Sequence, residues 1–78
     1  DLHVDQLLID ERGQMDAVLV GGMQLALGAE GFLDRMHRFE TVYRKELIMR
    51  RAEVERVDLR YDNGIAVAFS GSSQVAEL

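Results

Sequence analysis

The sequence predicts an α+β domain in which one helix packs on a face of an antiparallel sheet. Three observations support this fold class. Apolar residues alternate with other residues over residues 15–27, recur at helical spacing over residues 32–47, and alternate again over residues 57–69. The expected order is therefore a three-stranded meander, a helix and a C-terminal hairpin.

The first part of the chain predicts the meander. Residues 2–9 are expected to form a strand in a central or covered position, because apolar side chains fall on both of its faces. A turn over residues 11–14 contains Gly13, which tolerates a positive φ. Residues 15–20 and 23–27 are expected to form the next two strands, joined by a Gly21-Gly22 hairpin loop.

The helix is predicted from an apolar stripe. Its members recur every three or four residues, and they are Phe32, Met36, Phe39, Tyr43 and Leu47. Such a stripe is typical of a helix packed on a sheet rather than of a ligand or membrane site. Residues 47–54 either continue the helix or form a second short turn. They contain no proline or glycine, so the sequence leaves the position of the break open.

The C-terminal hairpin is the strongest local signal in the chain. Two alternating runs, residues 57–61 and 65–69, flank Asp62-Asn63-Gly64, and an Asn-Gly pair favours a tight hairpin turn. Residues 70–73 are Ser-Gly-Ser-Ser, and no further strand is expected after them. The strand over residues 65–69 is therefore expected at the edge of the sheet, where unpaired backbone groups can accept a partner strand.

Composition bounds the class of protein. The 78 residues are 47% hydrophobic, contain no cysteine and carry a formal net charge of −5, which suits one small domain without disulfides or thiolate metal sites. We expect a domain over residues 1–70 and a flexible tail over residues 71–78. No apolar run is long enough to cross a membrane. Because the chain opens on Asp1 rather than Met, we expect it to be part of a longer protein.

Neither nucleic-acid binding nor catalysis is indicated. The bases between residues 35 and 60 are interleaved with glutamates, which is poor material for a phosphate-binding surface. His3 and His37 share no motif, Asp10-Glu11 lies at a predicted turn, and the glycines lack the spacing of a phosphate-binding loop. We therefore predict a protein-interaction module with no enzyme activity, metal or cofactor. Two alternatives stay open: half of a small ligand-binding or enzyme domain, and a POTRA-like or secretion-related α+β module.

Three side chains of the hairpin are of the types enriched at binding hot spots, namely Arg60, Tyr61 and Phe69. Tyr61 and Phe69 equally fit core packing against the helix, so both interpretations of these aromatics stay open. Arg60 faces the other side of its strand and is expected on the surface.

Residues 57–67 have the sequence Val-Asp-Leu-Arg-Tyr-Asp-Asn-Gly-Ile-Ala-Val. This segment resembles the Val-Asp-Leu-Arg-Tyr…Asn-Gly…Ala-Val segment in the C-terminal β-domain of the bacterial cell division family FtsQ/DivIB, and weaker similarity extends to residues 39–43, 27–28 and 11–13. The resemblance implies a non-enzymatic scaffold of the division machinery. It also implies an inner-membrane protein whose transmembrane helix is absent from this fragment and whose β-domain is periplasmic. The implied partners are FtsB and FtsL, with a strand of FtsB added at the sheet edge.

Carried over by position, the resemblance implies these partner-binding residues: Arg12, Arg60, Tyr61, Asn63, Gly64, Val67, Ala68 and Phe69. Small side chains would let another backbone approach, and Phe69 would be an apolar anchor. The sequence departs from the family pattern at four positions. Met15 and Phe69 stand where the family usually has Trp, Arg44 where Pro is common, and Ala29 where Arg is frequent. The change at Phe69 keeps an apolar anchor but loses the indole N–H donor.

Overall fold

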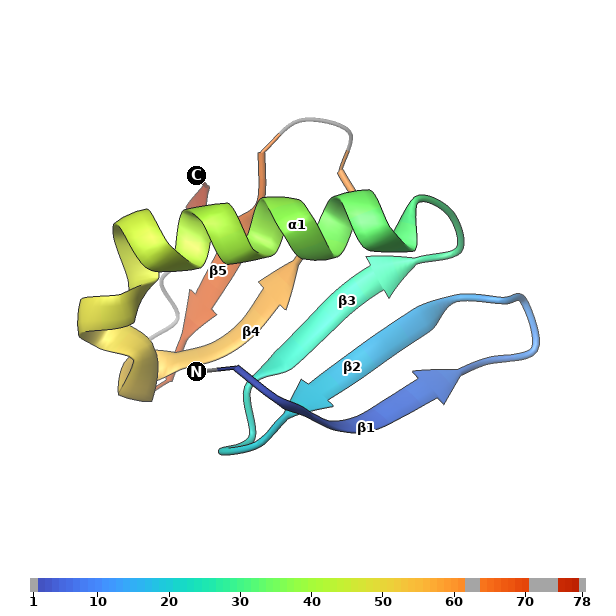
Figure 1. The fold of residues 1–78 in the computed structure, drawn as a ribbon, viewed down its shortest axis with the longest axis horizontal. Coiled ribbons are helices and arrows are strands. Elements are labelled where there is room, and N and C mark those ends of the chain that lie inside the picture. Colours follow the sequence, from blue (N-terminus) through green and yellow to red (C-terminus); the bar gives the residue numbers. More distant parts are fainter. Residues whose placement is uncertain (1, 62–63, 71–74, 78) are drawn as a thin grey trace.

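The computed structural model describes residues 2–61, 64–70 and 75–77, and these form one six-stranded sheet with the helix α1 on one face (Figure 1). The strands lie side by side in chain order, from β1 to β6. The elements are β1 (Val4–Ile9), β2 (Met15–Leu19), β3 (Gln24–Gly28), α1 (Phe32–Val42), β4 (Val54–Asp58), β5 (Ala66–Phe69) and β6 (Val75–Glu77). The predicted α+β class is confirmed.

The predicted meander is confirmed, because β1, β2 and β3 pair antiparallel. In the β1–β2 turn, the Asp10 N–H donates to the Gln14 carbonyl at 3.0 Å and Gly13 adopts a φ of 82°. In the β2–β3 turn, the Gly22 N–H donates to the Leu19 carbonyl at 2.9 Å. Both turns therefore close within a few residues, as the glycine positions predicted.

The connection from β3 to β4 changes the direction of pairing. β3 and β4 run parallel, with Leu25 opposite Val57. Parallel neighbours require a crossover connection, and here α1 supplies it across one face of the sheet. The sheet is therefore mostly antiparallel, with one parallel pair that the sequence pattern did not specify.

The helical segment changes character along its length. α1 passes into a π-helical turn, η1 (Tyr43–Leu47), and then into a 3₁₀ segment, η2 (Ile48–Glu53). Arg50 has a non-helical backbone with φ −120° and ψ 22°. The break that the sequence left open thus lies within η2. Among the described residues, no helix is both long and apolar enough to cross a membrane.

The core lies between α1 and the side of the sheet that faces it. Leu25, Val57 and Val67 stand in one row across β3, β4 and β5, and each is 0% exposed. Phe39 of α1 and Tyr43 of η1 are buried in the same cluster, which confirms the predicted stripe. Since strand side chains alternate, the next row falls on the opposite face of the sheet, and its members are Asp16, Ala26, Asp58 and Ala66.

The first strand is not where its sequence placed it. β1 lies at the edge of the sheet and all six of its residues are exposed, so the expected central or covered position is wrong. The reason is the placement of α1, which lies over β3 and β4 and leaves β1 uncovered (Figure 1). Apolar side chains on both faces therefore do not indicate a covered strand here.

A second correction concerns the other edge. β6 pairs antiparallel with β5, with Val67 opposite Ala76, so β5 is an inner strand and β6 forms the edge. The expectation that no strand follows residue 69 is wrong, because β6 has three residues and is too short to show an alternating pattern. Of the predicted flexible tail, residues 71–74 and 78 lie outside the described residues.

Candidate functional site

The end of β4 carries the first candidate residues. Val57 and Leu59 are buried as the alternation predicts, and the Leu59 N–H still donates to the Ala26 carbonyl at 2.8 Å. The chain then turns, because the Asp58 carboxylate accepts the backbone N–H of Arg60 at 3.0 Å. Tyr61 consequently leaves the helix-facing side and is 53% exposed. Of the two interpretations left open for Tyr61, the structure supports the surface one.

Arg60 forms a two-pronged ion pair with Asp58 on its own strand. Its Nε lies 2.9 Å from Oδ1 and its Nη2 lies 2.7 Å from Oδ2. The hydrogen bonds from the Arg60 side chain are the largest cause of the lowered pKa of the Asp58 carboxyl, and the same bonds raise the pKa of Arg60. The Arg60 side chain remains 53% exposed, so it is on the surface as predicted.

The stem of Arg60 crosses the backbone of β3 at Gly28. A β-carbon built on Gly28 would lie 3.4 Å from Cγ of Arg60, and Gly28 has a φ of 81°. Glycine is therefore suited to this position for two reasons: it adopts the left-handed backbone, and it leaves room for the arginine.

The candidate residues on β5 divide by burial. Val67 is 0% and Phe69 is 7% exposed, so both side chains belong to the core. The guanidinium carbon of Arg50 lies 4.1 Å from the centroid of the Phe69 ring, a cation–π contact that covers its outer side. Ala68 is half-buried, Gly64 is exposed, and Asn63 lies outside the described residues.

Arg12 lies in the β1–β2 turn, at the same end of the sheet as the β4–β5 connection but separated from it by β3 (Figure 1). Its guanidinium is 3.5 Å from the Asp10 carboxylate. Asp10 also accepts the backbone N–H groups of Gln14 at 2.9 Å and of Arg12 at 2.8 Å. The bond from Gln14 is the largest cause of the lowered pKa of the Asp10 carboxyl. Asp10 thus has a structural role in this turn.

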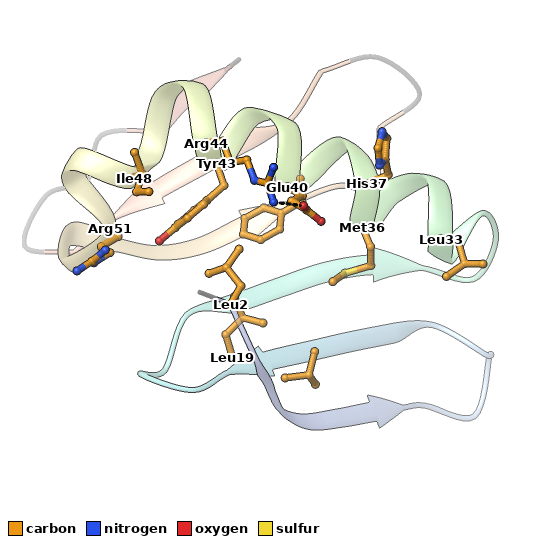
Figure 2. Close-up of a pocket in the computed structure, with 12 residues that line it drawn as sticks. Leu2, Leu19, Leu33, Met36, His37, Glu40, Tyr43, Arg44, Ile48 and Arg51 are labelled. Carbon is orange, nitrogen blue, oxygen red and sulfur yellow. Dashed lines mark ion pairs between the residues drawn. The ribbon is translucent and has the colours of Figure 1, made fainter.

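A groove of about 550 Å³ runs between α1 and the first strands (Figure 2). Leu2, Leu19 and Met36 are among its lining residues. His37 borders the groove, but its side chain points away from the sheet, and Glu40 is paired with Arg44 at 2.7 Å. Among the described residues, no group of three or more His, Cys, Asp or Glu side chains could hold a metal ion. The groove lining therefore mixes apolar side chains with the charged side chains of Glu40, Arg44 and Arg51, and Glu40 is already paired with Arg44.

Sequence reasoning missed two residues that act on this site. Arg35 and Arg38 are charged residues beside the apolar stripe, yet both are half-buried and bond to backbone carbonyls of the β4–β5 connection. A signal was available in the sequence. Arg35 and Arg38 are three residues apart, so they lie on one side of the helix, and each directly precedes a residue of the apolar stripe, Met36 or Phe39.

The fold is a two-layer α+β domain with an exposed arginine and an exposed tyrosine at one end of the sheet. The chain belongs to the FtsQ/DivIB family: residues 2–60 match the family described as cell division protein FtsQ/DivIB, C-terminal. The match covers β1 to β4 and ends at Arg60.

Individual relatives agree with the family match. The chain is 32% identical to the cell division protein FtsQ of Vibrio cholerae over 76 residues, which are 97% of this chain and 29% of that protein. It is 41% identical to FtsQ of Shewanella oneidensis over 71 residues, 91% of this chain and 26% of that protein. It is 38% identical to FtsQ of Coxiella burnetii over 64 residues, 82% of this chain and 26% of that protein. The chain thus spans about a quarter of the length of the curated relatives it matches.

Proposed function

We propose that this chain is the partner-binding part of a non-enzymatic cell division scaffold, which docks FtsB and FtsL in the periplasm. The scaffold would be held in the inner membrane by a part of the protein outside this fragment. The observation that carries the proposal is the family match over residues 2–60. The match covers β1 to β4 and α1, which support the connection between β4 and β5.

The surface that supports this proposal is small and mixed in character. Arg60 and Tyr61 are each 53% exposed, and both residue types are enriched among binding hot spots. Gly64 is exposed beside them, and Arg12 adds a cation at the same end of the sheet. An extended acidic and apolar segment is the partner chemistry that this surface suits.

The proposed mode of binding is β-augmentation beside β5, with the partner strand taking the place of β6. Three residues of β6 pair with Ala66, Val67 and Ala68, so the intramolecular contact is short. A longer partner strand forms more backbone hydrogen bonds along β5 and also reaches the exposed end of the hairpin. The small side chains of Ala66 and Ala68 lie on the face away from α1 and leave room for its approach.

The first test is Tyr61→Ala, with titration of a periplasmic FtsB peptide. We expect binding to weaken by about 2 kcal/mol, as for a hot spot. Met49→Ala is the matched control, because Met49 is 92% exposed on η2. Unchanged affinity in the tyrosine variant would remove Tyr61 from the site. Phe69→Ala is unsuitable for this test, because Phe69 is 7% exposed and its loss perturbs the core.

The same titration with residues 71–78 deleted tests the mode of binding. If the partner strand replaces β6, the shortened chain binds as tightly as the full chain or more tightly, since an internal competitor is gone. If the partner strand instead pairs with the outer edge of β6, the deletion abolishes binding, and the proposed place beside β5 is wrong.

A further inference from the structure

Two arginines of α1 point at the connection between β4 and β5. Arg35 and Arg38 are three residues apart and both are half-buried, so their side chains leave neighbouring positions on the helix. Arg35 Nη1 donates to the carbonyls of Leu59 and Tyr61, the second at 3.2 Å. Arg38 Nη1 donates to the carbonyls of Tyr61 at 2.8 Å and Gly64 at 3.3 Å. The connection is thus tied to the helix on both of its sides.

In the part of the chain that the structure describes, the two side chains donate to backbone carbonyls. Arg35 Nε also donates to the Glu30 carbonyl at 2.8 Å, just before α1 begins. Within residues 2–61 and 64–70, neither arginine pairs with a carboxylate. A guanidinium has five donors in a rigid fork, so one arginine can bridge several carbonyls that a strand partner does not reach. Arg35 and Arg38 therefore tie the backbone of Leu59, Tyr61 and Gly64 to α1.

We propose that Arg35 and Arg38 are positioning residues for partner binding, which hold the β4–β5 connection against α1 and so preset the orientation of Arg60 and Tyr61. This inference rests on the proposed function. The carbonyl of Tyr61 is bonded to both arginines, while its side chain is 53% exposed. A segment that is ordered before binding loses less conformational freedom when the partner arrives. The two arginines thus raise affinity without contacting the partner.

The test is Arg38→Met, titrated with the same FtsB peptide. Methionine keeps an unbranched stem and removes every N–H donor. We expect Kd to rise about tenfold, which corresponds to about 1.4 kcal/mol. Arg44→Met is the matched control, because Arg44 lies on the same helical segment and forms an exposed ion pair with Glu40. Unchanged Kd in Arg38→Met, or an equal rise in Arg44→Met, would overturn the proposal.

A positioning role is separated from a general structural role by two further readouts. Amide exchange should accelerate at Tyr61 and Gly64 in Arg38→Met, whereas exchange at Leu25 and Val67 in the core should not change. In a double-mutant cycle, Arg38→Met should add little to the loss already caused by Tyr61→Ala. Full additivity of the two losses would show that Arg38 does not act through Tyr61.

The cycle also distinguishes failure of this inference from failure of the proposed function. If Tyr61→Ala weakens binding and Arg38→Met does not, only the positioning role is wrong. If neither variant weakens binding, Tyr61 is not part of the docking site and the positioning role is wrong. If the unaltered chain does not bind the FtsB peptide, the proposed function is wrong. Arg35→Met extends the test to Leu59, and Arg38→Met remains decisive if that variant fails to fold.

Discussion

Asp58 is the residue on which the end of β4 depends most. Its carboxylate accepts the backbone N–H of Arg60 at 3.0 Å and two side-chain N–H groups of the same residue at 2.9 and 2.7 Å. The Asp58 side chain is 15% exposed, whereas that of Arg60 is 53% exposed. One carboxylate therefore ends the strand, turns the chain and orients a candidate contact residue.

The first prediction concerns pH and Asp58→Asn. The pKa of Asp58 is lowered in the folded protein, chiefly by the Arg60 side chain. Its contribution to stability is therefore present above the unfolded pKa of about 3.9 and is lost as pH falls through the folded value. Because Arg60 is half exposed, we expect the variant to lose only about 0.5 to 1 kcal/mol at pH 7.

Urea unfolding of both chains at pH 7, 4 and 2.5 measures this difference. The gap between wild type and Asp58→Asn should narrow below pH 4. Glu55→Gln, at an exposed position of β4, is the control for removing a surface carboxylate. A gap that is the same at pH 7 and pH 2.5 would show that the ion pair does not contribute.

At the scale of elements, α1 and its extension hold the sheet together. The helical segment buries Phe39, Tyr43 and Leu47 against strands from both halves of the chain, while Leu33, which lines the groove, is 77% exposed. The rings of Phe39 and Tyr43 have centroids 5.8 Å apart, a tilted aromatic pair that continues the stripe across the junction of α1 and η1.

The second prediction is that Phe39→Ala costs about 3 to 5 kcal/mol of folding free energy, since it leaves a cavity at a site that is 1% exposed. Leu33→Ala on the same helix should change stability by less than about 0.5 kcal/mol. Denaturant unfolding of the two variants gives the comparison. Equal losses in both would contradict the assignment of the buried face.

Local sequence patterns predicted most of the helices and strands, but they predicted little of how each element is buried or which elements lie beside it. The meander, the helical stripe and the antiparallel pairing of β4 with β5 follow from periodicity, which is local in the sequence. The predicted runs 57–61 and 65–69 are longer than the strands, because the last pair is Asp58 with Ala66 and the connection spans residues 59–65 rather than a tight Asn-Gly turn. The exposure of β1 depends on where α1 lies, the place of β5 depends on a strand of three residues, and the burial of Arg35 depends on carbonyls 24 or more residues away. The first and third depend on contacts between distant parts of the chain, and the second depends on a strand too short to show an alternating pattern.

The candidate site shows the same division. Exposure of Arg60 followed from strand alternation, but Tyr61 lies beyond the point where Asp58 ends that alternation. The family resemblance implies that Val67 and Phe69 contact a partner, but the side chains of both residues are buried in the core. A motif therefore predicts the region that binds a partner. The burial of each side chain then decides which residues of that region can contact the partner.

At the scale of the whole molecule, the two edges of the sheet differ. β6 is short and lies beside the candidate site, whereas β1 is a six-residue edge with large exposed apolar side chains. Leu7, Leu8 and Ile9 are 49%, 53% and 62% exposed. An uncovered apolar edge strand is a surface at which copies of a chain pair with one another.

The third prediction is that this chain, studied alone, self-associates through β1. Leu8→Lys should shift sedimentation at high protein concentration toward the monomer, because a charge on an edge strand opposes pairing. Leu33→Lys, which adds the same charge to an exposed site on α1, should leave self-association unchanged. A similar shift in both variants would mean that net charge, and not the β1 edge, controls the association.

The parallel pairing of β3 with β4 has a consequence for the order of folding. The meander and the β4–β5 hairpin each close between neighbours in the chain, so each can form early and independently. The strand pairing of Gln24, Leu25 and Ala26 with Arg56, Val57 and Asp58 joins them into one sheet, and it must bring together segments more than thirty residues apart. Such closure is slow relative to local hairpin formation. We therefore expect the pairing of β3 with β4 to limit the folding rate of the chain.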